Sequence, residues 1–218
     1  SMMAMMENEE RASIIQTMAN PYCLNDNMTG LDGRDRMSAF FDEDFDAWIG
    51  PFVMAGVNTR VVRRSNELLD SAYGTDFRYD EGTVISKGAR GFLGAAALGA
   101  GTGAVAGLAA LSFTRPLLKK VLPKPGEGPT TEAIENGHFH VELRGIHPTD
   151  PSKNMTAHVR GDKDPGYGST SKMIVESALA LAQDELPVAG GFWTPASAMG
   201  DTLLSRLPAS AGVTFEID

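Results

Sequence analysis

A run of 24 residues without a charged side chain, from Gly91 to Thr114, constrains the fold of this chain most. Six glycines and eight alanines make up more than half of the run, and Arg90 and Arg115 flank it. About 20 apolar residues are enough for a helix to span a bilayer, but Gly and Ala contribute little insertion energy. We expect an apolar helix or helical hairpin here. Three settings stay open: a helix pair buried against protein, docking on a lipid surface, and a membrane span.

Glycine recurs every four residues within this run, at Gly99, Gly103 and Gly107. Residues four apart share one face of a helix, so these glycines predict a smooth strip along which another helix can approach closely. The letters of residues 101–106 also match the G-x-G-x-x-A pattern of dinucleotide-binding turns. That pattern needs a strand before the turn, and residues 95–100 contain no β-branched residue. We therefore expect helix packing here and no cofactor site in this chain.

The charge of the whole chain is acidic. It has 19 basic and 28 acidic residues, a net charge of −9. This balance excludes a general nucleic-acid-binding protein, because affinity for phosphate backbones comes from clustered Lys and Arg. Cys23 is the single cysteine, so we expect neither an internal disulfide nor a cysteine-based zinc site. This cysteine usage and the lack of a recognisable secretory signal favour a cytoplasmic location.

The pattern of apolar residues predicts an α+β fold with a mostly antiparallel sheet and helices packed on one face. We expect residues 1–50 to form an N-terminal helix and a draped loop, and residues 51–218 to form a second domain that carries the apolar insert 91–114. Helices are expected over 2–19, from Pro51 to about Leu69, from Ser169 or Thr170 to Gln183, and from Pro195 to Leu207; strands are expected over 75–85, 138–144, 155–160 and 213–217. The helix after Pro51 should bury a stripe of Met54, Val57, Val61 and Leu68.

Three arginines on that helix are the strongest electrostatic feature of the chain: Arg60, Arg63 and Arg64. One interpretation is surface ion pairing, such as Arg63 with Glu67 four residues later. The other is binding of an anion or a substrate, because Arg64 falls beside the apolar stripe and Asn58 lies near it. We expect Arg64 to be partly buried and paired with a carboxylate or an anionic ligand.

Two further polar groups have a structural and a chemical interpretation. His138 and His140 share one face of a predicted strand, and His158 comes near them across the antiparallel pair. Their charged neighbours indicate a solvated surface and no fourth ligand is marked, so we expect no metal site. Lys172 and Glu176 lie four residues apart on a helix that looks buried. Such a pair is more often structural than catalytic, and Lys172 stays a candidate for substrate binding.

Several blocks of the sequence resemble the saccharopine dehydrogenase-like oxidoreductases. The branch that the chain resembles includes the trans-acting enoyl reductases of mycobacterial lipid synthesis and the saccharopine dehydrogenase-like proteins of lipid droplets. The blocks follow the family order and cover nearly the whole chain. They are Pro51–Ala55, Asn58–Asn66, Tyr73-Gly74, Phe77–Tyr79, Pro123–Pro129, Asp164–Gly168, Thr194–Ala196 and Gly200-Asp201.

The resemblance implies a function for the chain. Family members begin with a Rossmann domain that binds NAD(P), and this chain resembles the C-terminal domain, which shapes the substrate pocket and mediates association. We expect this domain to serve an NAD(P)-dependent oxidoreductase of lipid metabolism and to be inactive alone. The alternative is a non-catalytic module that associates with a membrane or a lipid-droplet surface.

The resemblance also implies partners and pocket residues. The expected partners are the Rossmann domain and a lipid-type substrate, with a membrane or lipid-droplet surface and a homodimer left open. Carried over residue by residue, the candidates for lining the substrate pocket are Asn58, Arg60, Arg63, Arg64 and Tyr167.

Overall fold

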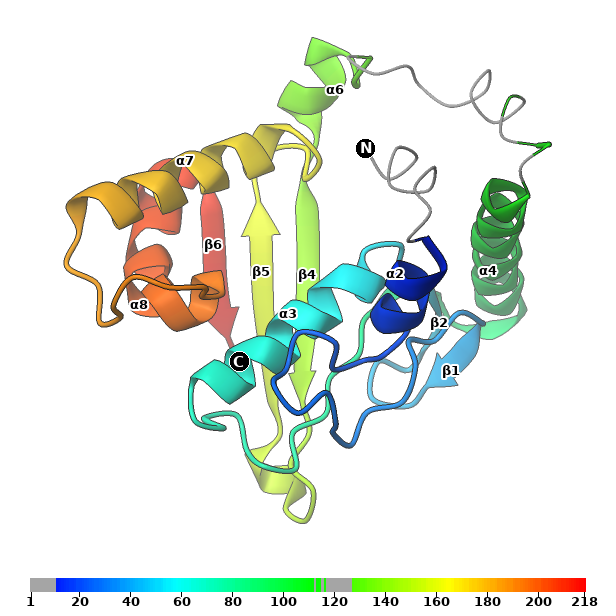
Figure 1. Ribbon diagram of the computed structural model, residues 1–218. Helices are drawn as coiled ribbons and strands as arrows, with labels where there is room; N and C mark the ends of the chain where they lie inside the picture. Colours follow the sequence, from blue (N-terminus) through cyan, green and yellow to red (C-terminus); the bar gives the residue numbers. More distant parts are fainter. Residues whose placement is uncertain (1–10, 112, 115, 117–126) are drawn as a thin grey trace. The chain divides into compact units, whose positions relative to one another are not determined.

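The computed structural model describes residues 11–111, 113–114, 116 and 127–218 (Figure 1). The chain divides into two compact units, residues 1–122 and 123–218. Each unit holds one antiparallel sheet of three strands together with helices, so the predicted α+β class is confirmed. The boundary that we placed near residue 50 falls inside the first unit. Of the predicted helix over 2–19, residues 2–10 lie outside the described part, as do residues 123–126 of the Pro-rich block.

The first unit builds its sheet in the order β1-β2-β3. Part of the expected loop is ordered as a hairpin, because the Asp42 side chain accepts hydrogen bonds from the backbone N–H groups of Asp44 and Phe45 and so closes the turn between β1 and β2. The elements of this unit are α2 (Arg11–Met18), β1 (Phe40–Asp42), β2 (Ala47–Pro51), α3 (Ala55–Leu68), β3 (Gly82–Ser86) and α4 (Gly88–Ala110).

Two sequence-based boundaries in this unit are wrong. Pro51 ends strand β2 opposite Gly82 and does not open a helix, and α3 starts only at Ala55. The expected strand over 75–85 begins at Gly82. The residues before it are held by side chains and not by a neighbouring strand: the backbone N–H of Tyr79, for example, donates to the Asp32 carboxylate. Alternation of apolar residues could not show that these backbone groups have other partners.

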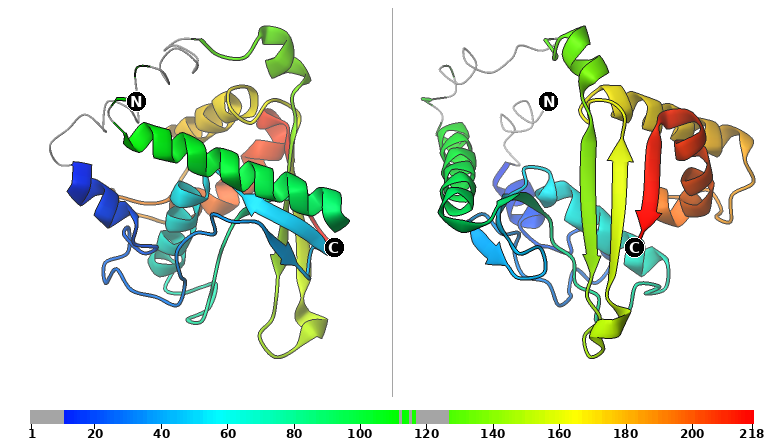
Figure 2. Two further views of the ribbon diagram at one scale, coloured as in Figure 1. Left: turned by 90° about the vertical axis from the view of Figure 1, so that its right-hand side faces the viewer. Right: turned by 180° about the vertical axis from the view of Figure 1, so that it is seen from behind.

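Helix α4 is one continuous helix beside the β1–β3 sheet (Figure 2). Its first part packs on the strands: Ala95 is fully buried, and a β-carbon added at Gly91 would lie 1.9 Å from the backbone oxygen of Ser86. Glycine is therefore needed at position 91 for contact with a strand. A β-carbon added at Gly99 would meet the Met37 backbone oxygen at 3.4 Å.

In the described part of the chain, no helix lies against the glycine strip in the rest of α4. Among the residues that the structure describes, nothing lies within 4 Å of a β-carbon added at Gly103 or Gly107. Only 6% of the most apolar 18-residue window of α4 is buried. By length and composition alone, α4 is long and apolar enough to cross a membrane. Within the described residues this part of α4 is thus not covered by a second helix, and the three settings stay predictions.

The second unit confirms most of its predicted elements. Strands β4 and β5 pair antiparallel, with His140 opposite Arg160 and Glu142 opposite His158, and β6 completes the order β4-β5-β6. The elements are α6 (Thr131–Asn136), β4 (Phe139–Gly145), the 3-10 turn η1 (Pro151–Lys153), β5 (Met155–Gly161), α7 (Gly168–Gln183), α8 (Pro195–Arg206), the π-helical turn η2 (Leu207–Ala211) and β6 (Val213–Ile217).

Helices α7 and α8 lie on the same face of this sheet (Figure 2). The core between helices and sheet contains Leu207, Ala211 and Val213, with Val159 and Met173 packed against them. The prediction that α7 is buried is only partly right, because one of its faces is exposed. Within the described residues its outer apolar side chains Ile174, Val175 and Leu181 are exposed, whereas its other face contacts α8, η2 and the sheet.

Replacing Gly161 by Ala tests the pairing of β4 with β5. A β-carbon at Gly161 would lie 2.0 Å from the ring of Phe139, its partner across the ladder. We expect Gly161→Ala to lower the free energy of unfolding by about 1–3 kcal/mol, because the ring must shift inside a packed core. Urea denaturation measures this change.

The matched control is Gly145→Ala at the other end of the same pair. There the new β-carbon would lie 3.7 Å from the Met155 backbone oxygen, which is ordinary contact. We expect a change within about 0.5 kcal/mol. Equal losses at both positions would contradict the assigned register.

Candidate functional site

Two of the arginines predicted as ligand-binding residues lie on the buried face of α3. Arg60 and Arg63 are only 5% and 4% exposed, whereas Met54 and Val57 of the predicted apolar stripe are exposed. The stripe was therefore wrong. The reason is that α3 faces the largely irregular segment 19–39, whose backbone groups have few partners in regular structure and need polar side chains.

Arg63 uses all of its nitrogens inside the first unit. Its Nε donates to Asp32 Oδ2 at 2.5 Å, Nη1 to the Pro21 carbonyl at 3.1 Å, and Nη2 to the Tyr79 carbonyl at 2.6 Å. Asp32 in turn accepts from the Tyr22 hydroxyl at 3.2 Å. A polar hollow of about 440 Å³ lies beside this group, between α3 and the segments on either side of it. Arg63, which lines this hollow, is already paired with the carboxylate of Asp32.

Arg60 and Arg64 also find their partners in the chain. Arg60 pairs with Asp35 and donates to the Met18 carbonyl at 3.1 Å. Arg64 is partly buried and lies 2.9 Å from Asp26 and 2.5 Å from Glu67, as its predicted pairing with a carboxylate required. The hydrogen bond to Glu67 raises the pKa of Arg64.

These pairings overturn the predicted ion pair of Arg63 with Glu67, and they leave the predicted substrate role of the α3 residues untested. Glu67 forms its ion pair with Arg64, so the predicted pair of Arg63 with Glu67 is wrong. Asn58 donates to Glu81 Oε2 at 3.0 Å, which satisfies this amide within the chain as well. A substrate role for the four residues on α3 stays a prediction, and their described contacts are explained by internal pairing.

The predicted site residues of the second unit lie at the start of α7. Tyr167 is exposed and its backbone N–H donates to Asp164 Oδ2 at 2.7 Å, which closes the predicted turn. Lys172 pairs with Asp162 at 3.0 Å, because the end of β5 lies beside this helix. The predicted partnership of Lys172 with Glu176 is therefore wrong, and Glu176 binds Arg206 at 3.0 Å.

Two of the three histidines, His140 and His158, meet as predicted, whereas His138 lies just before β4. His140 Nε2 lies 3.0 Å from His158 Nδ1, and His158 Nε2 lies 3.1 Å from Asp218 Oδ2. Within the described part of the chain, no group of three or more His, Cys, Asp or Glu side chains is placed to hold a metal ion.

The dinucleotide-binding pattern does not lie at a turn between a strand and a helix. Residues 101–106 lie inside α4, where the backbone N–H groups belong to a helix interior. Pyrophosphate binding needs free N–H groups at a helix N-terminus that follows a strand. These residues therefore do not fit a dinucleotide.

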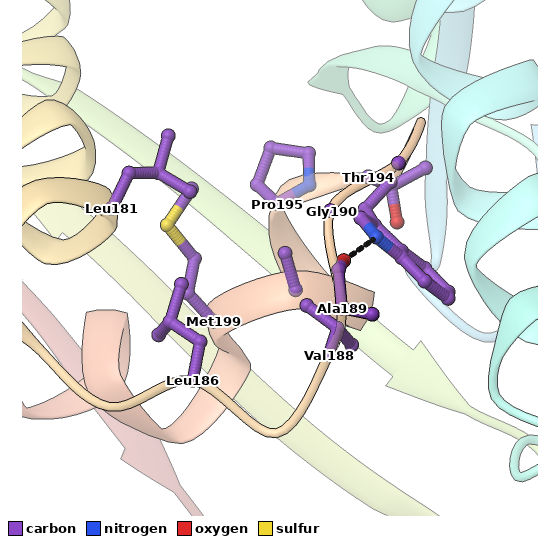
Figure 3. A pocket seen from close by; sticks show the side chains of 11 residues that line it. Leu181, Leu186, Val188, Ala189, Gly190, Thr194, Pro195 and Met199 are labelled. Carbon is purple, nitrogen blue, oxygen red and sulfur yellow. Dashed lines mark hydrogen bonds between the residues drawn. The ribbon is translucent and has the colours of Figure 1, made fainter.

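An apolar pocket in the second unit is the best candidate for a binding site (Figure 3). It has a volume of about 340 Å³ and lies between the end of α7, residues 186–194 and the start of α8. Leu181, Leu186 and Met199 gather on one side, with the backbone of Ala189 and Gly190 opposite (Figure 3). Among its described lining residues there is no charged side chain, histidine or cysteine.

Short polar contacts hold the wall of this pocket in place. Thr194 and Ser197 cap α8 reciprocally, since each side chain accepts a hydrogen bond from the other residue's backbone N–H. The Trp193 indole donates to the Ala189 carbonyl at 2.8 Å. Met199 leaves helical geometry inside α8, with φ −149° and ψ 30°, at the point where it lines the pocket.

An ion-pair cluster joins the two helices that flank the pocket. Arg206 near the end of α8 donates to Asp184 Oδ2 at 2.6 Å and Oδ1 at 3.0 Å, just beyond α7, and also to Glu176. The bidentate hydrogen bond lowers the pKa of Asp184 and raises that of Arg206.

The pocket is suited to holding an apolar chain and not to proton transfer. Its walls are aliphatic and aromatic, and the Trp193 N–H and the Thr194 hydroxyl are satisfied by the chain. Sequence reasoning assigned none of its residues to a site. The signal that could have found it is a pair of glycines followed by two aromatic residues, Phe192 and Trp193, before the helix that Pro195 opens.

The chain has clear relatives among mycobacterial proteins. It is 43% identical over 174 residues to a trans-acting enoyl reductase of Mycobacterium ulcerans, and 42% identical over 176 residues to one of Mycobacterium bovis. A protein of Mycobacterium tuberculosis that carries this name in provisional form is 43% identical over 175 residues. No family model and no solved structure matches the chain.

These matches cover most of the chain but a smaller part of each relative. The aligned region is 76–78% of this chain and 40–41% of the relatives' own length. The chain thus spans about two fifths of the curated relatives that it matches.

Removing the Arg63 guanidinium tests whether it supports the fold. Arg63→Met leaves the nearly buried Asp32 carboxylate unpaired, and we expect the first unit to lose about 3–5 kcal/mol of unfolding free energy. Asn at position 32 in the same variant should restore part of the loss. Urea denaturation followed by Trp48 fluorescence in a Trp193→Phe background reports on this unit.

Arg64→Met is the control, since Arg64 pairs with the exposed Asp26 and with Glu67 on its own helix. We expect a loss within about 1 kcal/mol. Comparable losses for the two arginines would contradict the special role of the buried pair.

The pH dependence of unfolding tests the Asp184–Arg206 pair. A carboxylate whose folded-state pKa is lowered adds stability above its unfolded pKa of about 3.9, and this contribution is lost as the pH falls through the folded-state pKa. Asp184→Asn should therefore flatten the decline in stability of the second unit below about pH 4. Urea denaturation at several pH values, followed by Trp193 fluorescence in a Trp48→Phe background, measures the slope.

Asp201→Asn on the exposed side of α8 should keep the steep decline of the parent chain. Part of the slope should persist in Asp184→Asn as well, because hydrogen bonds from Lys163 and Ser152 lower the pKa values of Glu135 and Asp150. Identical slopes for the parent chain and Asp184→Asn would contradict the prediction.

Proposed function

From the premise that this chain is a homologue of the trans-acting enoyl reductases, we propose that it is the substrate-binding part of an oxidoreductase that acts on a lipid-type enoyl substrate. The names of the relatives describe reductases, and they do not favour a non-catalytic module. The observation that carries the proposal is the apolar pocket between α7 and α8.

The chemistry of the pocket suits the apolar part of such a substrate. Reduction of an enoyl group acts on a carbon–carbon double bond at one end of a long hydrocarbon chain, which supplies most of the binding surface. A pocket with aliphatic walls gains about 25 cal/mol for each Å² of apolar surface that it removes from water. The volume of about 340 Å³ fits part of an acyl chain and not a whole lipid.

The reducing cofactor belongs to another part of the proposed enzyme. NAD(P) supplies hydride in oxidoreductases of the kind that the chain resembles, and residues 101–106 do not fit it. In this proposal a Rossmann domain binds the cofactor, as the relatives' additional length allows, while this chain orients the acyl chain and keeps water away from it. The 218 residues alone are then inactive in hydride transfer.

Binding of trans-2-hexadecenoic acid tests the pocket. The chain has two tryptophans, so Trp48→Phe leaves Trp193 at the pocket as the single reporter. We expect a saturable change in Trp193 fluorescence. Leu181→Glu places a charge on the pocket wall at an exposed position, and we expect it to weaken binding at least about tenfold.

Ile174→Glu is the matched control, because Ile174 is an equally exposed apolar residue of α7 that does not line the pocket. Its affinity should equal that of the parent chain. No saturable change in the parent chain, or equal weakening by both substitutions, would refute binding in this pocket.

A further inference from the structure

We propose that the exposed end of α4 inserts into a phospholipid surface that carries anionic headgroups. This inference concerns the first unit and does not depend on the pocket of the second. Large apolar side chains are exposed along this part of the helix at Val105 and Leu108, and just after it at Leu111. Exposed apolar surface of this extent is unfavourable in water and marks a site of interaction.

The helix is open on opposite sides, which favours lipid over a protein partner. Gly101 and Gly103 lie two residues apart and so point about 200° apart around the helix. Within the described residues, a β-carbon added at either glycine would meet nothing within 4 Å. A surface helix of a water-soluble domain carries a charged face, and α4 has none from Gly91 onward. A protein partner covers one face of a helix, whereas acyl chains surround it.

Charge complementarity identifies the kind of lipid. Between Glu81 and Glu127 the sequence has no acidic residue, although the whole chain has 28. The same stretch contains six of the 19 basic residues. They flank α4 in sequence and are Lys87, Arg90, Arg115, Lys119, Lys120 and Lys124. Basic residues beside an apolar segment are attracted to anionic headgroups, at about 1 kcal/mol for each near the surface.

Aromatic residues lie at both ends of the helix, as they do in proteins that enter the interface. At the first end Phe92 packs on Trp48 with ring centroids 4.8 Å apart, and Trp48 packs on Phe41 at 5.7 Å. Phe41 and Phe92 are about half exposed. Beyond the other end, Phe113 is 77% exposed. Aromatic side chains are favoured at the level of the headgroups.

The packing of α4 limits how deeply it can enter. Ala95 and Gly91 hold the first part of the helix on the strands, so the free part starts near Gly99. From there to Ala110 the helix extends about 17 Å at 1.5 Å per residue. The hydrocarbon core of a bilayer is about 30 Å thick. The free part is therefore too short to span the bilayer. Because basic residues flank α4 at both ends in sequence and stay at the headgroups, the helix enters one leaflet just below the headgroups.

Flotation of the 218-residue chain with vesicles tests this proposal. We expect the chain to float with vesicles of equal parts phosphatidylcholine and phosphatidylglycerol, and less with phosphatidylcholine alone. Val105→Glu places a charge in the inserted part and should reduce the vesicle-bound fraction at least about tenfold. Val53→Glu, the same change at an exposed position outside α4, should float like the parent chain. Far-UV circular dichroism checks that each variant is folded, and Leu108→Glu serves in place of a misfolded Val105→Glu.

Gly103→Leu distinguishes lipid from a second copy of the chain. It adds apolar surface where the helix is open, so flotation should be kept or increased, whereas a helix pair through the glycine strip would be blocked. A parent chain that stays at the bottom with both vesicle types would overturn the proposal, as would flotation that Val105→Glu leaves unchanged. A third result would also overturn it: the parent chain sediments as a dimer, and Gly103→Leu both dissociates the dimer and abolishes flotation.

Discussion

The buried ion pair between Arg63 and Asp32 organises the first unit. The segment between α2 and β1 has little regular structure, and an isolated chain of this kind would leave its carbonyl groups to water. One guanidinium group joins this segment at Pro21 and Asp32 to the segment before β3 at Tyr79. Burying two charges is costly unless they are paired and hydrogen-bonded, and this pair is both. Helix α3, which carries Arg63, therefore holds two irregular segments in place.

The second unit is held together by apolar packing between its sheet and its helices. The sheet and two helices enclose a core, and two polar contacts lie at the ends of the helices, the Thr194–Ser197 cap and the Arg206–Asp184 pair. Both contacts hold the segment that joins α7 to α8. The apolar pocket is formed by this segment, so its shape depends on polar groups that make their hydrogen bonds within the chain. A rigid frame around an apolar volume suits the binding of a flexible acyl chain, because less order has to be created on binding.

The surfaces that are accessible to a ligand differ between the two units. The arginines of α3 that were candidates for binding a ligand are paired with carboxylates of the chain itself. Two apolar surfaces stay exposed, the pocket in the second unit and the outer part of α4 in the first, and a polar hollow lies beside α3. The pocket suits the proposed apolar substrate better than a small anion, because no charged residue is among its described lining residues.

Local pattern alone was enough for several elements. The strand pair of β4 and β5, the start of α8 at Thr194-Pro195 and the apolar helix α4 were all predictable, because alternation, capping and composition act over a few residues. The buried face of α3 was not predictable in this way. It is decided by carboxylates such as Asp32 and Asp35, which lie more than 20 residues away in the chain. Periodicity counts apolar residues and cannot show that a helix will bury its charges against partners from a distant loop. The pocket likewise exists only where α7, α8 and the segment between them come together in space.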